Sequence, residues 1–427
     1  MVKGYSFHVF KINSENFLYL SGYKQLFKID DQEFKTLKYD GNNKSNILNK
    51  YVELTNPIDR KPIKKIEPSR FGLFLCVANV CNASCEYCFA KQGDYGREKG
   101  IMTNDIAIKS IDFFINSVPV DSLANIIFFG GEPLLAFNVI VHACEYINSK
   151  YEKVRMISKR IVTNATLLTE EIIDYFKNNN FTVAISIDGG KEIQNRQRPL
   201  ADGKDSFEEA TKYLNYLLEK IPHTNARGTY VNFNYNLAKI YEELLDLGFK
   251  SIEVPPDILN FKDEKQMEML LCQMDNLYEY ILSYIKNHND FPFDLFTATI
   301  RFIFLPKFIN EYACGAGRNI ISIDYKGNIF PCHRYTAEEK YQIGNINNNL
   351  DELKYLINKK NDCEYCWNKF ICSHGCMYND HIYKGSKNPF WCIYSKKMTE
   401  LSLALCINMS KETLNNILTL DEVNYKQ

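Results

Sequence analysis

The sequence predicts an α/β protein whose central domain is a parallel sheet, closed as a partial barrel or left open as a wound sheet. Short apolar runs alternate with amphipathic helical stretches from Phe71 onward, and this alternation is typical of strand–helix–strand units. A strand-rich unit precedes this domain and a cysteine-rich region follows it. Such units connect by right-handed crossovers, so functional loops are expected at the carboxyl ends of the strands.

Residues 1–67 are expected to form a small separate unit. Apolar-aromatic runs predict three strands at 6–12, 17–20 and 26–28, and Asp30 or Asp31 can cap a helix through Leu37. Two interpretations stay open. The strands extend the sheet of the next domain, or they dock a peptide along an exposed edge. A linker is expected where prolines recur, at Pro57, Pro62 and Pro68.

The domain at 70–290 supplies the alternating units. Strands are expected at 71–77, 126–129, 160–163, 181–188, 229–233 and 251–254. Helices are expected to start after Thr103, at Phe137, after Thr169, after Ser206 and at Leu237. A long helix at about 264–287 leads into a bridging segment, 291–313. The cysteine-rich region covers 314–395, and 396–427 is expected to hold the end of a helix near 395–408 and a polar tail that frays.

Composition restricts the functional classes. The chain has 427 residues, with 51 Lys+Arg against 52 Asp+Glu, and this balance gives no reason to expect a nucleic-acid or anionic-membrane partner. The start has no signal-peptide pattern, and no apolar run approaches the roughly 18 residues of a membrane span. We therefore expect a cytoplasmic protein with no membrane and no nucleic-acid partner.

Cysteine is unusually frequent, with 14 residues. In a large chain without a signal peptide, clustered cysteines more often bind metal than form disulfides. They gather at 81–88 and at 314–392. Four others stand alone and are interpreted as core residues: Cys76, Cys144, Cys272 and Cys406.

The first cluster is the loop Cys81-x3-Cys85-x2-Cys88, directly after the first barrel strand. Thiolates are the usual iron–sulfur ligands, and this short spacing lets one loop wrap one cluster. Three thiolates on a four-iron cluster leave one iron open to a small molecule. The alternatives are a zinc site or redox cysteines, although zinc usually requires a fourth ligand that this loop lacks.

The loop resembles that of the radical S-adenosylmethionine (SAM) enzymes, which share the Cys-x3-Cys-x-aromatic-Cys pattern after the first strand. The resemblance implies a partial (β/α)6 TIM-like barrel and a [4Fe–4S] cluster whose open iron holds SAM. It further implies that an electron from the cluster cleaves SAM to a 5′-deoxyadenosyl radical, which abstracts a hydrogen atom. Tyr87, at the aromatic position, would lie beside the adenine.

Strand-end motifs support the same resemblance. Gly130, Gly131 and Glu132, followed by Pro133, resemble the family's motif for the SAM amino group, although alone this sequence is a turn. By similarity Ser186 binds the ribose or carboxylate of SAM and Arg198 the carboxylate.

Other interpretations of these positions remain open. Asp188 and Arg198 are alternatively loop-ordering residues, and Val254 lines the adenine pocket or is a plain core valine. Thr163-Asn164-Ala165 departs from the family's Thr-Asn-Gly, so no role is carried over to it.

The cysteine-rich region resembles the SPASM extension of radical SAM peptide-modifying enzymes. The resemblance implies two auxiliary [4Fe–4S] clusters, hence three clusters in total. By position, the outer one is held by Cys363, Cys366, Cys372 and Cys392. The inner one is held by Cys314, Cys332 and Cys376. The alternative is a pair of zinc knots.

The inner set lacks the further cysteine that related enzymes place shortly before the position of Cys314, because 305–313 contains none. Either His333 fills that position, or an open iron takes a substrate thiolate. The flanks 88–96, 227–229, 314–317 and 331–333 resemble sactipeptide and ranthipeptide maturases. Anaerobic sulfatase maturases carry Asp where His333 stands.

The resemblance covers about 70–395 and implies an enzyme that forms thioether crosslinks in a ribosomally made, cysteine-rich precursor peptide. It also implies a flavodoxin- or ferredoxin-type electron donor, and it favours 1–67 as a truncated winged-helix module that binds the leader peptide. Within the enzymes, the alternatives are a carbon–carbon crosslink, epimerisation or formylglycine formation. From another class, the alternative is a non-catalytic peptide-binding protein stabilised by metal.

Overall fold

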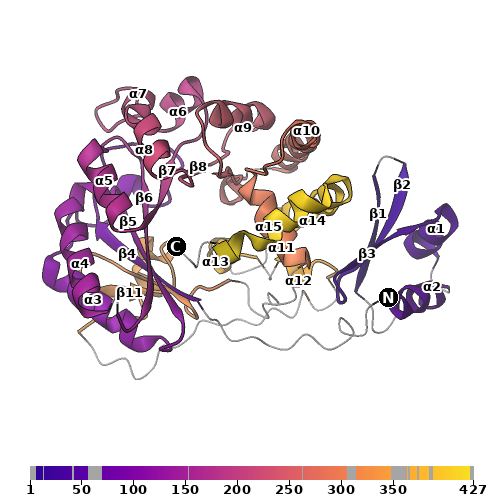
Figure 1. The fold of residues 1–427 in the computed structure, drawn as a ribbon, viewed down its shortest axis with the longest axis horizontal. Coiled ribbons are helices and arrows are strands. Elements are labelled where there is room, and N and C mark those ends of the chain that lie inside the picture. Colours follow the sequence, from indigo (N-terminus) through magenta and orange to yellow (C-terminus); the bar gives the residue numbers. More distant parts are fainter. Residues whose placement is uncertain are drawn as a thin grey trace.

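The computed structural model describes residues 6–12, 14–40, 43–55, 70–151, 153–261, 263–304, 314–347, 363, 366–372, 375–383 and 388–423. Figure 1 shows the barrel domain at one end, the N-terminal unit at the other, and the C-terminal helices between them. In this described part, no helix has both the length and the apolar character that a membrane crossing requires.

The central domain is built on a nine-stranded sheet in the order β12-β11-β10-β4-β5-β6-β7-β8-β9. Its parallel strands follow chain order: β4 (Arg70–Ala78), β5 (Leu123–Gly130), β6 (Met156–Thr163), β7 (Phe181–Ser186), β8 (Asn225–Arg227) and β9 (Ile252–Glu253). The connecting helices are α3 (Asn104–Ser117), α4 (Phe137–Lys150), α5 (Glu170–Asn178), α6 (Lys191–Gln197), α7 (Phe207–Thr211), α8 (Leu214–Lys220) and α9 (Leu237–Asp246). The expected α/β partial barrel is therefore confirmed.

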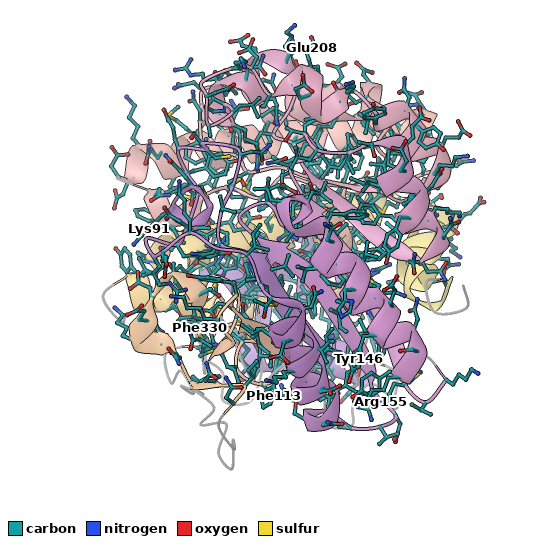
Figure 2. The ribbon with its side chains drawn as sticks, turned by 90° about the vertical axis from the view of Figure 1, so that its left-hand side faces the viewer. Lys91, Phe113, Tyr146, Arg155, Glu208 and Phe330 are labelled. Carbon is teal, nitrogen blue, oxygen red and sulfur yellow. The ribbon has the colours of Figure 1, made fainter. Side chains whose placement is uncertain are left out.

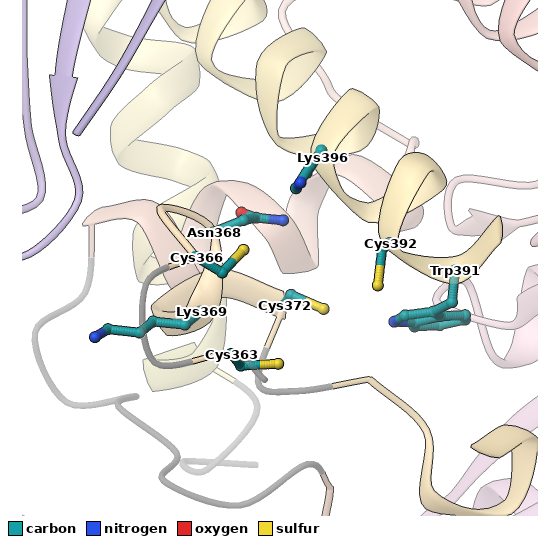
Figure 3. Close-up of a pocket in the computed structure, with 8 residues that line it drawn as sticks. All are labelled: Cys363, Cys366, Asn368, Lys369, Cys372, Trp391, Cys392 and Lys396. Carbon is teal, nitrogen blue, oxygen red and sulfur yellow. The ribbon is translucent and has the colours of Figure 1, made fainter. Parts of the chain in front are cut away.

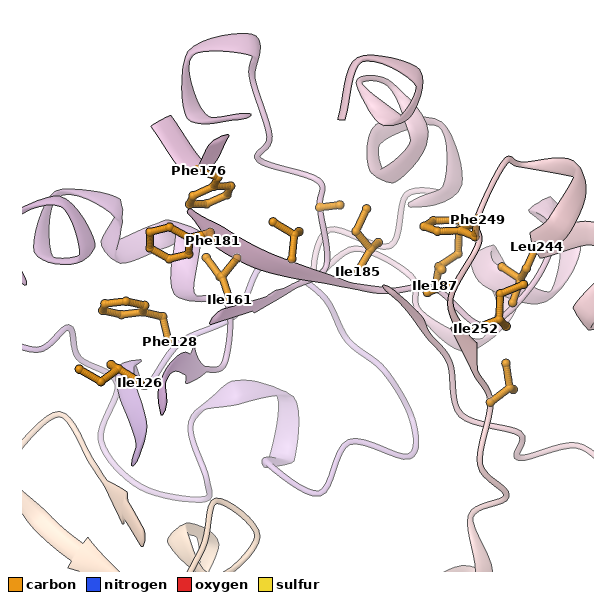
Figure 4. Close-up of a cluster of buried hydrophobic side chains, with 14 of the residues drawn as sticks. Ile126, Phe128, Ile161, Phe176, Phe181, Ile185, Ile187, Leu244, Phe249 and Ile252 are labelled. Carbon is orange, nitrogen blue, oxygen red and sulfur yellow. The ribbon is translucent and has the colours of Figure 1, made fainter. Parts of the chain in front are cut away.

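The two faces of this sheet differ because successive strand residues point to opposite sides. One face carries large apolar side chains that pack under the helices; Figure 4 shows Phe128, Ile161 and Ile185 among them, with Phe176 of α5 above. The residues between them, such as Phe129 and Arg160, belong to the opposite, helix-free face. This second face is the inside of the barrel.

The helical layer is fixed by polar contacts as well. The hydroxyl of Tyr146 on α4 donates to Asp112 on α3 at 2.8 Å. The Arg155 guanidinium donates to the carbonyls of Ile115 and Val118, where α3 ends, at 2.6 and 2.8 Å. Figure 2 shows Tyr146 and Arg155 close together at one end of the barrel. The two Arg155 contacts satisfy carbonyls that the helix end leaves without partners.

The cysteine-rich region continues the barrel sheet rather than forming a separate one. β10 (Ile320–Ile323) pairs in parallel with β4, and β11 (Asn328–Phe330) and β12 (Gly344–Asn345) follow antiparallel. Short helices carry its later part: α12 (Lys369–Cys372) and α13 (Met377–Ile382). In the part of the chain that the structure describes, 3-10 turns occur at η1 (Lys91–Gly93), η2 (Pro133–Ala136), η3 (Ile258–Asn260), η4 (Tyr335–Ala337) and η5 (Glu339–Tyr341).

Longer helices join the regions: α10 (Glu264–Asn287), α11 (Asp294–Phe304), α14 (Pro389–Asn408) and α15 (Lys411–Val423). α10 coincides with the expected long helix. The bridging segment 291–313 contains α11 in its first part, and its remainder, 305–313, lies outside the described residues.

The N-terminal unit has its own antiparallel sheet, β1 (Phe7–Ile12), β2 (Glu15–Leu20) and β3 (Gln25–Ile29), with helices α1 (Asp31–Tyr39) and α2 (Lys44–Glu53). Asp30 caps α1 through a capping box with Glu33. Because these strands form a separate sheet, the interpretation that they extend the barrel sheet is wrong. The expected linker at 57–68 lies outside the described residues.

Several expectations need correction. The fifth barrel strand is Asn225–Arg227, not 229–233, and the helix expected after Ser206 is broken into α7 and α8. The expected fraying tail contains α15, which buries Ile417 at 1% exposure. Cys76 and Cys144 are buried as expected, whereas Cys272 is exposed and Cys406 is half-buried.

Candidate active site

The loop of Cys81, Cys85 and Cys88 leaves the carboxyl end of β4 and is held on two sides by backbone hydrogen bonds. On one side, the N–H of Glu132 donates to the carbonyl of Val80 at 2.9 Å. On the other, the N–H of Ser84 donates to Pro199 at 2.8 Å, and Ala201 donates to the carbonyl of Asn82 at 2.9 Å. The strand end of β5 and the segment after Arg198 therefore enclose the thiols.

Glycines allow this close approach. A Cβ at Gly131 would lie 2.2 Å from the carbonyl oxygen of Val80, and one at Gly93 would lie 2.5 Å from the Cβ of Cys81. Gly130 has a φ of +141° and would meet the carbonyl of Ala78 at 2.3 Å. Gly130 thus packs against the end of β4, and Gly131 packs against Val80, directly before the first cysteine of the loop.

Glu132 is buried and ties β5 to the end of β6. Its carboxylate accepts from the Thr163 hydroxyl at 2.7 Å and from the N–H groups of Leu134 and Asn164 at 3.0 and 2.7 Å. Burial raises the pKa of this carboxyl to about 7, although these three donors oppose the rise. A carboxylate can accept about four hydrogen bonds. The three donors leave Glu132 room for one more, and its contact with the SAM ammonium stays a prediction.

Asn164 contacts the cysteine loop, a role that the sequence did not predict. Its side-chain amide donates to Asn82 at 2.8 Å and lies 3.9 Å from the Cys81 sulfur. Ala165 follows with a φ of +65°, a conformation that favours glycine. The alanine that replaces the glycine of Thr-Asn-Gly thus adopts a backbone conformation that glycine reaches more readily. The resemblance of 163–165 to the family's Thr-Asn-Gly pattern was the sequence feature that could have pointed to Asn164.

Asp188, Tyr87 and Arg198 form one buried polar group beside the thiols. The Tyr87 hydroxyl donates to Asp188 at 2.5 Å, and the Arg198 Nε lies 3.0 Å from the other carboxylate oxygen. The N–H of Thr229 donates to that same oxygen at 2.8 Å. The Arg198 guanidinium also lies over the Tyr87 ring, 5.2 Å from its centre.

This group is strongly shielded from solvent, since the Asp188 side chain is 0% and the Arg198 side chain 13% exposed. Burial raises the pKa of Tyr87 well above its usual value. Burial alone would lower the pKa of Arg198, but Asp188 and Tyr87 raise it on balance. These direct contacts support the interpretation that Asp188 and Arg198 order the loop. A contact between Arg198 and a ligand stays a prediction.

The other two sequence-assigned contacts lie at the ends of β7 and β9. Ser186 ends β7 and is half-buried, opposite Arg227 of β8. Val254 is fully buried, and its Cγ1 lies 3.2 Å from where a Cβ of Gly228 would be. Its N–H donates to the Tyr241 hydroxyl at 3.4 Å. These contacts are those of a core valine, and a role at the adenine stays a prediction.

The thiols of the loop suit an iron–sulfur cluster by their electrostatics. Burial, Glu132 and the other two thiols raise the pKa of Cys81 to about 12. Burial also raises the pKa of Cys85, and Arg198 only partly opposes this. A thiolate is the ligand form, so these side chains need a positively charged metal centre to ionise together.

The sequence-assigned inner set converges in space. Cys314, Cys332 and Cys376 pack around the buried rings of Phe330 and Tyr335. Burial, Cys376 and Cys314 raise the pKa of Cys332 to about 12. Positions 62 residues apart in sequence, from 314 to 376, are thus neighbours.

The sequence-assigned outer set lines one cavity of ≈ 310 Å³, counted with its solvent-open space. Figure 3 shows the sulfurs of Cys363, Cys366, Cys372 and Cys392 directed toward it. Trp391 and Lys396 also line the cavity. Among the described residues, no three His, Cys, Asp or Glu side chains lie close enough together to hold a single metal ion.

His333 lies between the cysteine loop and the inner set. It follows Cys332, and its ring centre is 4.2 Å from that of Phe74, 5.1 Å from Phe129 and 5.6 Å from Phe89. Its Nδ1 is buried and accepts or donates no hydrogen bond among the described residues. The ring thus stands on the inner face of the sheet, among aromatic side chains.

Comparisons with known proteins agree with this geometry. Residues 75–247 match the model of the radical SAM superfamily. "Uncharacterized protein MJ0907" of Methanocaldococcus jannaschii is 33% identical over 256 residues, which are 57% of this chain and 84% of that protein. The "Cysteine-type anaerobic sulfatase-maturating enzyme" of Clostridium perfringens strain 13 is 25% identical over 323 residues, 69% of this chain and 85% of that enzyme.

A solved structure shares the fold. "Native anSMEcpe with bound AdoMet and Cp18Cys peptide" superposes with a TM-score of 0.66 at 23% identity, covering 81% of this chain and 99% of that one. The barrel, its strand-end cysteine loop and the family match together lead to one assignment. The chain belongs to the radical SAM superfamily and is a SAM-dependent enzyme with a [4Fe–4S] cluster.

Proposed function

We propose that this enzyme modifies a ribosomally made, cysteine-containing peptide and forms a thioether crosslink in it. The observation that carries the proposal is the grouping of the thiols into a loop of three, an inner set of three and an outer set of four. A set of three leaves one position of a four-iron cluster for a substrate thiol. A thioether-forming enzyme needs such a position close to its radical source.

In this proposal Cys81, Cys85 and Cys88 hold the SAM cluster. Gly130, Gly131 and Glu132 receive the amino end of SAM, and Tyr87, Ser186, Arg198 and Val254 line the remainder of its site. When bound, SAM and its cluster supply a carbon-centred radical that takes a hydrogen atom from the substrate. The residues of this chain order the loop, bury it and exclude water from it.

The remaining sets hold the auxiliary [4Fe–4S] clusters, the inner one at Cys314, Cys332 and Cys376 and the outer one at the four thiols of the cavity. When bound with three protein ligands, the inner cluster offers an open iron to a substrate thiolate. A flavodoxin- or ferredoxin-type protein supplies electrons. The placement of His333 among Phe74, Phe89 and Phe129 supports an open position, because its ring is packed there rather than free to turn.

The N-terminal unit binds the leader of the peptide in this proposal. The unit is a three-stranded sheet with two helices, and it packs on the C-terminal region through Phe10, Phe17 and Tyr19. A docked module with its own sheet can hold one end of a long substrate while the other end reaches the barrel.

The first test is anaerobic reconstitution with iron, sulfide, SAM and a reductant. We expect 5′-deoxyadenosine from the wild type. A variant with Cys81, Cys85 and Cys88 all changed to Ala is expected to keep auxiliary iron but to form none. If the wild type forms no 5′-deoxyadenosine while its iron and sulfide are complete, the radical assignment fails.

The second test identifies the bond, with a peptide encoded by a short cysteine-rich reading frame beside the gene. A thioether loses two hydrogens and consumes one thiol, both of which mass spectrometry with thiol alkylation detects. A carbon–carbon crosslink loses two hydrogens and keeps every thiol, and epimerisation changes no mass. Either of these results contradicts the thioether proposal.

Formylglycine formation is the second candidate, favoured by the similarity to an anaerobic sulfatase-maturating enzyme over 69% of this chain. It predicts an aldehyde in the product, which a hydrazide probe captures, and no crosslink. His333 in place of Asp is the sequence feature that disfavours it.

A further inference from the structure

The cavity of the outer thiols contains a buried hydrogen-bond donor without an acceptor. The indole of Trp391 lines this cavity together with Cys363, Cys366, Cys372 and Cys392. Its Nε1 is shielded from solvent and has no hydrogen-bond partner in the part of the chain that the structure describes. A buried N–H without an acceptor costs free energy, and such groups are rare in folded proteins. This donor therefore fits a ligand of the cavity that offers an acceptor.

The indole directs its nitrogen toward the thiols. In Figure 3 the nitrogen of Trp391 lies on the edge of the ring that faces the four sulfurs. Cys392 follows Trp391 in the first turn of α14, and both side chains line the cavity. Asn368 lines it too, but its amide donates to Ser395 at 3.0 Å and its carbonyl oxygen accepts from Thr399 at 2.8 Å. The polar atoms of Asn368 are thus already used, whereas the indole N–H is not.

Packing fixes the position of the indole. Asn388 caps α14, because its side-chain oxygen accepts from the N–H groups of Phe390 and Trp391 at 3.0 and 3.4 Å. The Tyr394 ring meets the indole edge to face, with ring centres 5.8 Å apart. A Cβ at Gly375 would lie 2.8 Å from Nε1, so this glycine, at a φ of +86°, lets the backbone approach the nitrogen. The donor is held in place rather than free to turn toward solvent.

The sulfur atoms of an iron–sulfur cluster are acceptors that suit this donor. Hydrogen bonds to such sulfurs are among the features that set the reduction potential of a cluster. Reduction adds negative charge to the acceptor, and hydrogen bonds to charged groups are stronger than those to neutral ones. An N–H bond to sulfur therefore stabilises the reduced form more than the oxidised form.

We propose that the Trp391 Nε1–H donates a hydrogen bond to a sulfur of the outer cluster and raises the reduction potential of that cluster. This inference rests on the proposed function, which assigns the cluster to the four thiols of the cavity. It gives Trp391 a redox-tuning role.

A raised potential suits the proposed reaction. When the carbon–sulfur bond forms, the peptide C–H bond gives its hydrogen atom to the 5′-deoxyadenosyl radical, and the thiol proton goes to solvent. One electron is left over and needs an acceptor. A hydrogen bond from Trp391 favours the outer site for this purpose.

The test compares full-length chains in which the three loop thiols are Ala, so that only auxiliary clusters are reconstituted. Electron paramagnetic resonance (EPR) follows their reduction while mediators set the potential. The EPR component that disappears in the variant Cys366→Ala/Cys372→Ala belongs to the outer cluster. The component that remains is the internal reference for the inner one.

We expect Trp391→Phe to lower the ratio of reduced to oxidised outer cluster about tenfold at a given potential, which is a shift of about 59 mV for a one-electron couple. The inner component is expected to keep its midpoint. Trp367→Phe is the matched control, because the Trp367 ring stacks on His8, 3.9 Å between ring centres, and does not line the cavity. An unchanged midpoint in Trp391→Phe, or equal shifts in the two variants, would overturn the inference.

A second measurement keeps Trp391 in place. The chain has two tryptophans, so a Trp367→Phe protein with ¹⁵N-labelled indole carries the label at Trp391 alone. Pulsed EPR of its reduced outer cluster is expected to show hyperfine coupling to ¹⁵N, and an outer component without this coupling overturns the inference alone. A wild type with loop and inner clusters but no outer component overturns the cluster assignment of the proposed function instead.

Discussion

Gly131 shows how one residue sets the shape of the cysteine loop. A methyl group there would lie 2.2 Å from the carbonyl oxygen and 2.6 Å from the carbonyl carbon of Val80, both backbone atoms that cannot swing aside. We expect Gly131→Ala to destabilise the fold by roughly 1–3 kcal/mol and to displace the loop. Urea unfolding and iron content after anaerobic reconstitution measure the two effects.

Gly22 provides the matched control, since a Cβ there meets nothing within 4 Å. Gly22→Ala is expected to keep both the unfolding midpoint and the iron content. A Gly131→Ala protein with the full iron content of the wild type would show that the loop tolerates displacement.

Asp294 gives stability a pH dependence of definite sign. Burial raises the pKa of this carboxyl to about 6, and its hydrogen bonds from Ser251 and Asn225 only partly oppose this. The folded state therefore favours the protonated form, and the stability it adds is lost as pH rises through about 6. We expect the wild type to lose about 1 kcal/mol between pH 5 and 7 relative to Asp294→Asn.

Urea unfolding of both proteins at pH 5 and pH 7 checks this difference. Asp121→Asn, at an exposed position, is the control and is expected to follow the wild type. A difference between wild type and Asp294→Asn that does not change with pH would contradict the assignment.

Residue-level expectations can be formed where the chemistry is local in sequence. The three-thiol spacing, the paired glycines and the 4+3 division of the later cysteines are visible in the chain, and their ligand roles stay predictions. The partners of Asp188 are not visible in it, because Tyr87 lies 101 residues before it and the N–H of Thr229 lies 41 residues after it.

At the scale of elements, β8 shows why pattern alone misplaced a strand. The run 229–233 has the alternating aromatic and β-branched residues of a strand, but the N–H of Thr229 is bonded to Asp188 and the Tyr230 ring packs on Phe233. The true strand, Asn225–Arg227, is polar because two of its residues face the barrel interior. Tertiary contacts outweighed intrinsic propensity.

The sequence did not predict α15, because its helix cap and its apolar residues are present but form only a weak helical pattern. Ser410 accepts from the N–H of Thr413 at 3.0 Å as a helix cap. Leu414 packs on the core and Ile417 is buried, at a helical spacing of three. The Arg301 Nε donates to the Ile417 carbonyl at 2.9 Å, which fixes the helix on α11. A polar surrounding sequence concealed this two-residue apolar stripe.

The junction of β10 with the barrel depends on a buried ion pair. Arg97 lies 3.2 Å from Asp324, with side chains 16% and 2% exposed, and also donates to the carbonyl of Thr336. Arg97→Met leaves the Asp324 carboxylate buried without its counter-charge. We expect a loss of about 3 kcal/mol in the free energy of unfolding, measured with urea.

The control for that variant is Lys109→Met, which breaks the exposed pair with Asp105, at 53% and 71% exposure. Its expected cost is below about 1 kcal/mol. Equal losses in the two variants would mean that the Arg97 pair does not hold β10 against the barrel.

At the scale of the whole molecule, the N-terminal unit is attached to the segment that carries the outer thiols. The His8 ring stacks on Trp367 with centres 3.9 Å apart, and Ile371 belongs to the same apolar cluster as Phe17 and Tyr19. His8 also contacts Glu400 of α14 at 2.7 Å. Trp367 and Ile371 lie between Cys366 and Cys372. If the outer thiols hold a cluster as proposed, its assembly and the docking of the unit are expected to be coupled.

The double variant Cys366→Ala/Cys372→Ala tests this coupling. If these thiols hold the proposed cluster, their removal takes away the constraint that fixes Trp367 and Ile371, and the docked unit loses its support. A unit of about 50 residues is only marginally stable alone, so we expect its β2 amides to exchange hydrogen faster. Amides of β6 in the barrel are expected to be unchanged, and Cys272→Ala, at an exposed position, is the cysteine control. Unaltered exchange in β2 despite lost outer iron would mean that the unit docks independently of the cluster.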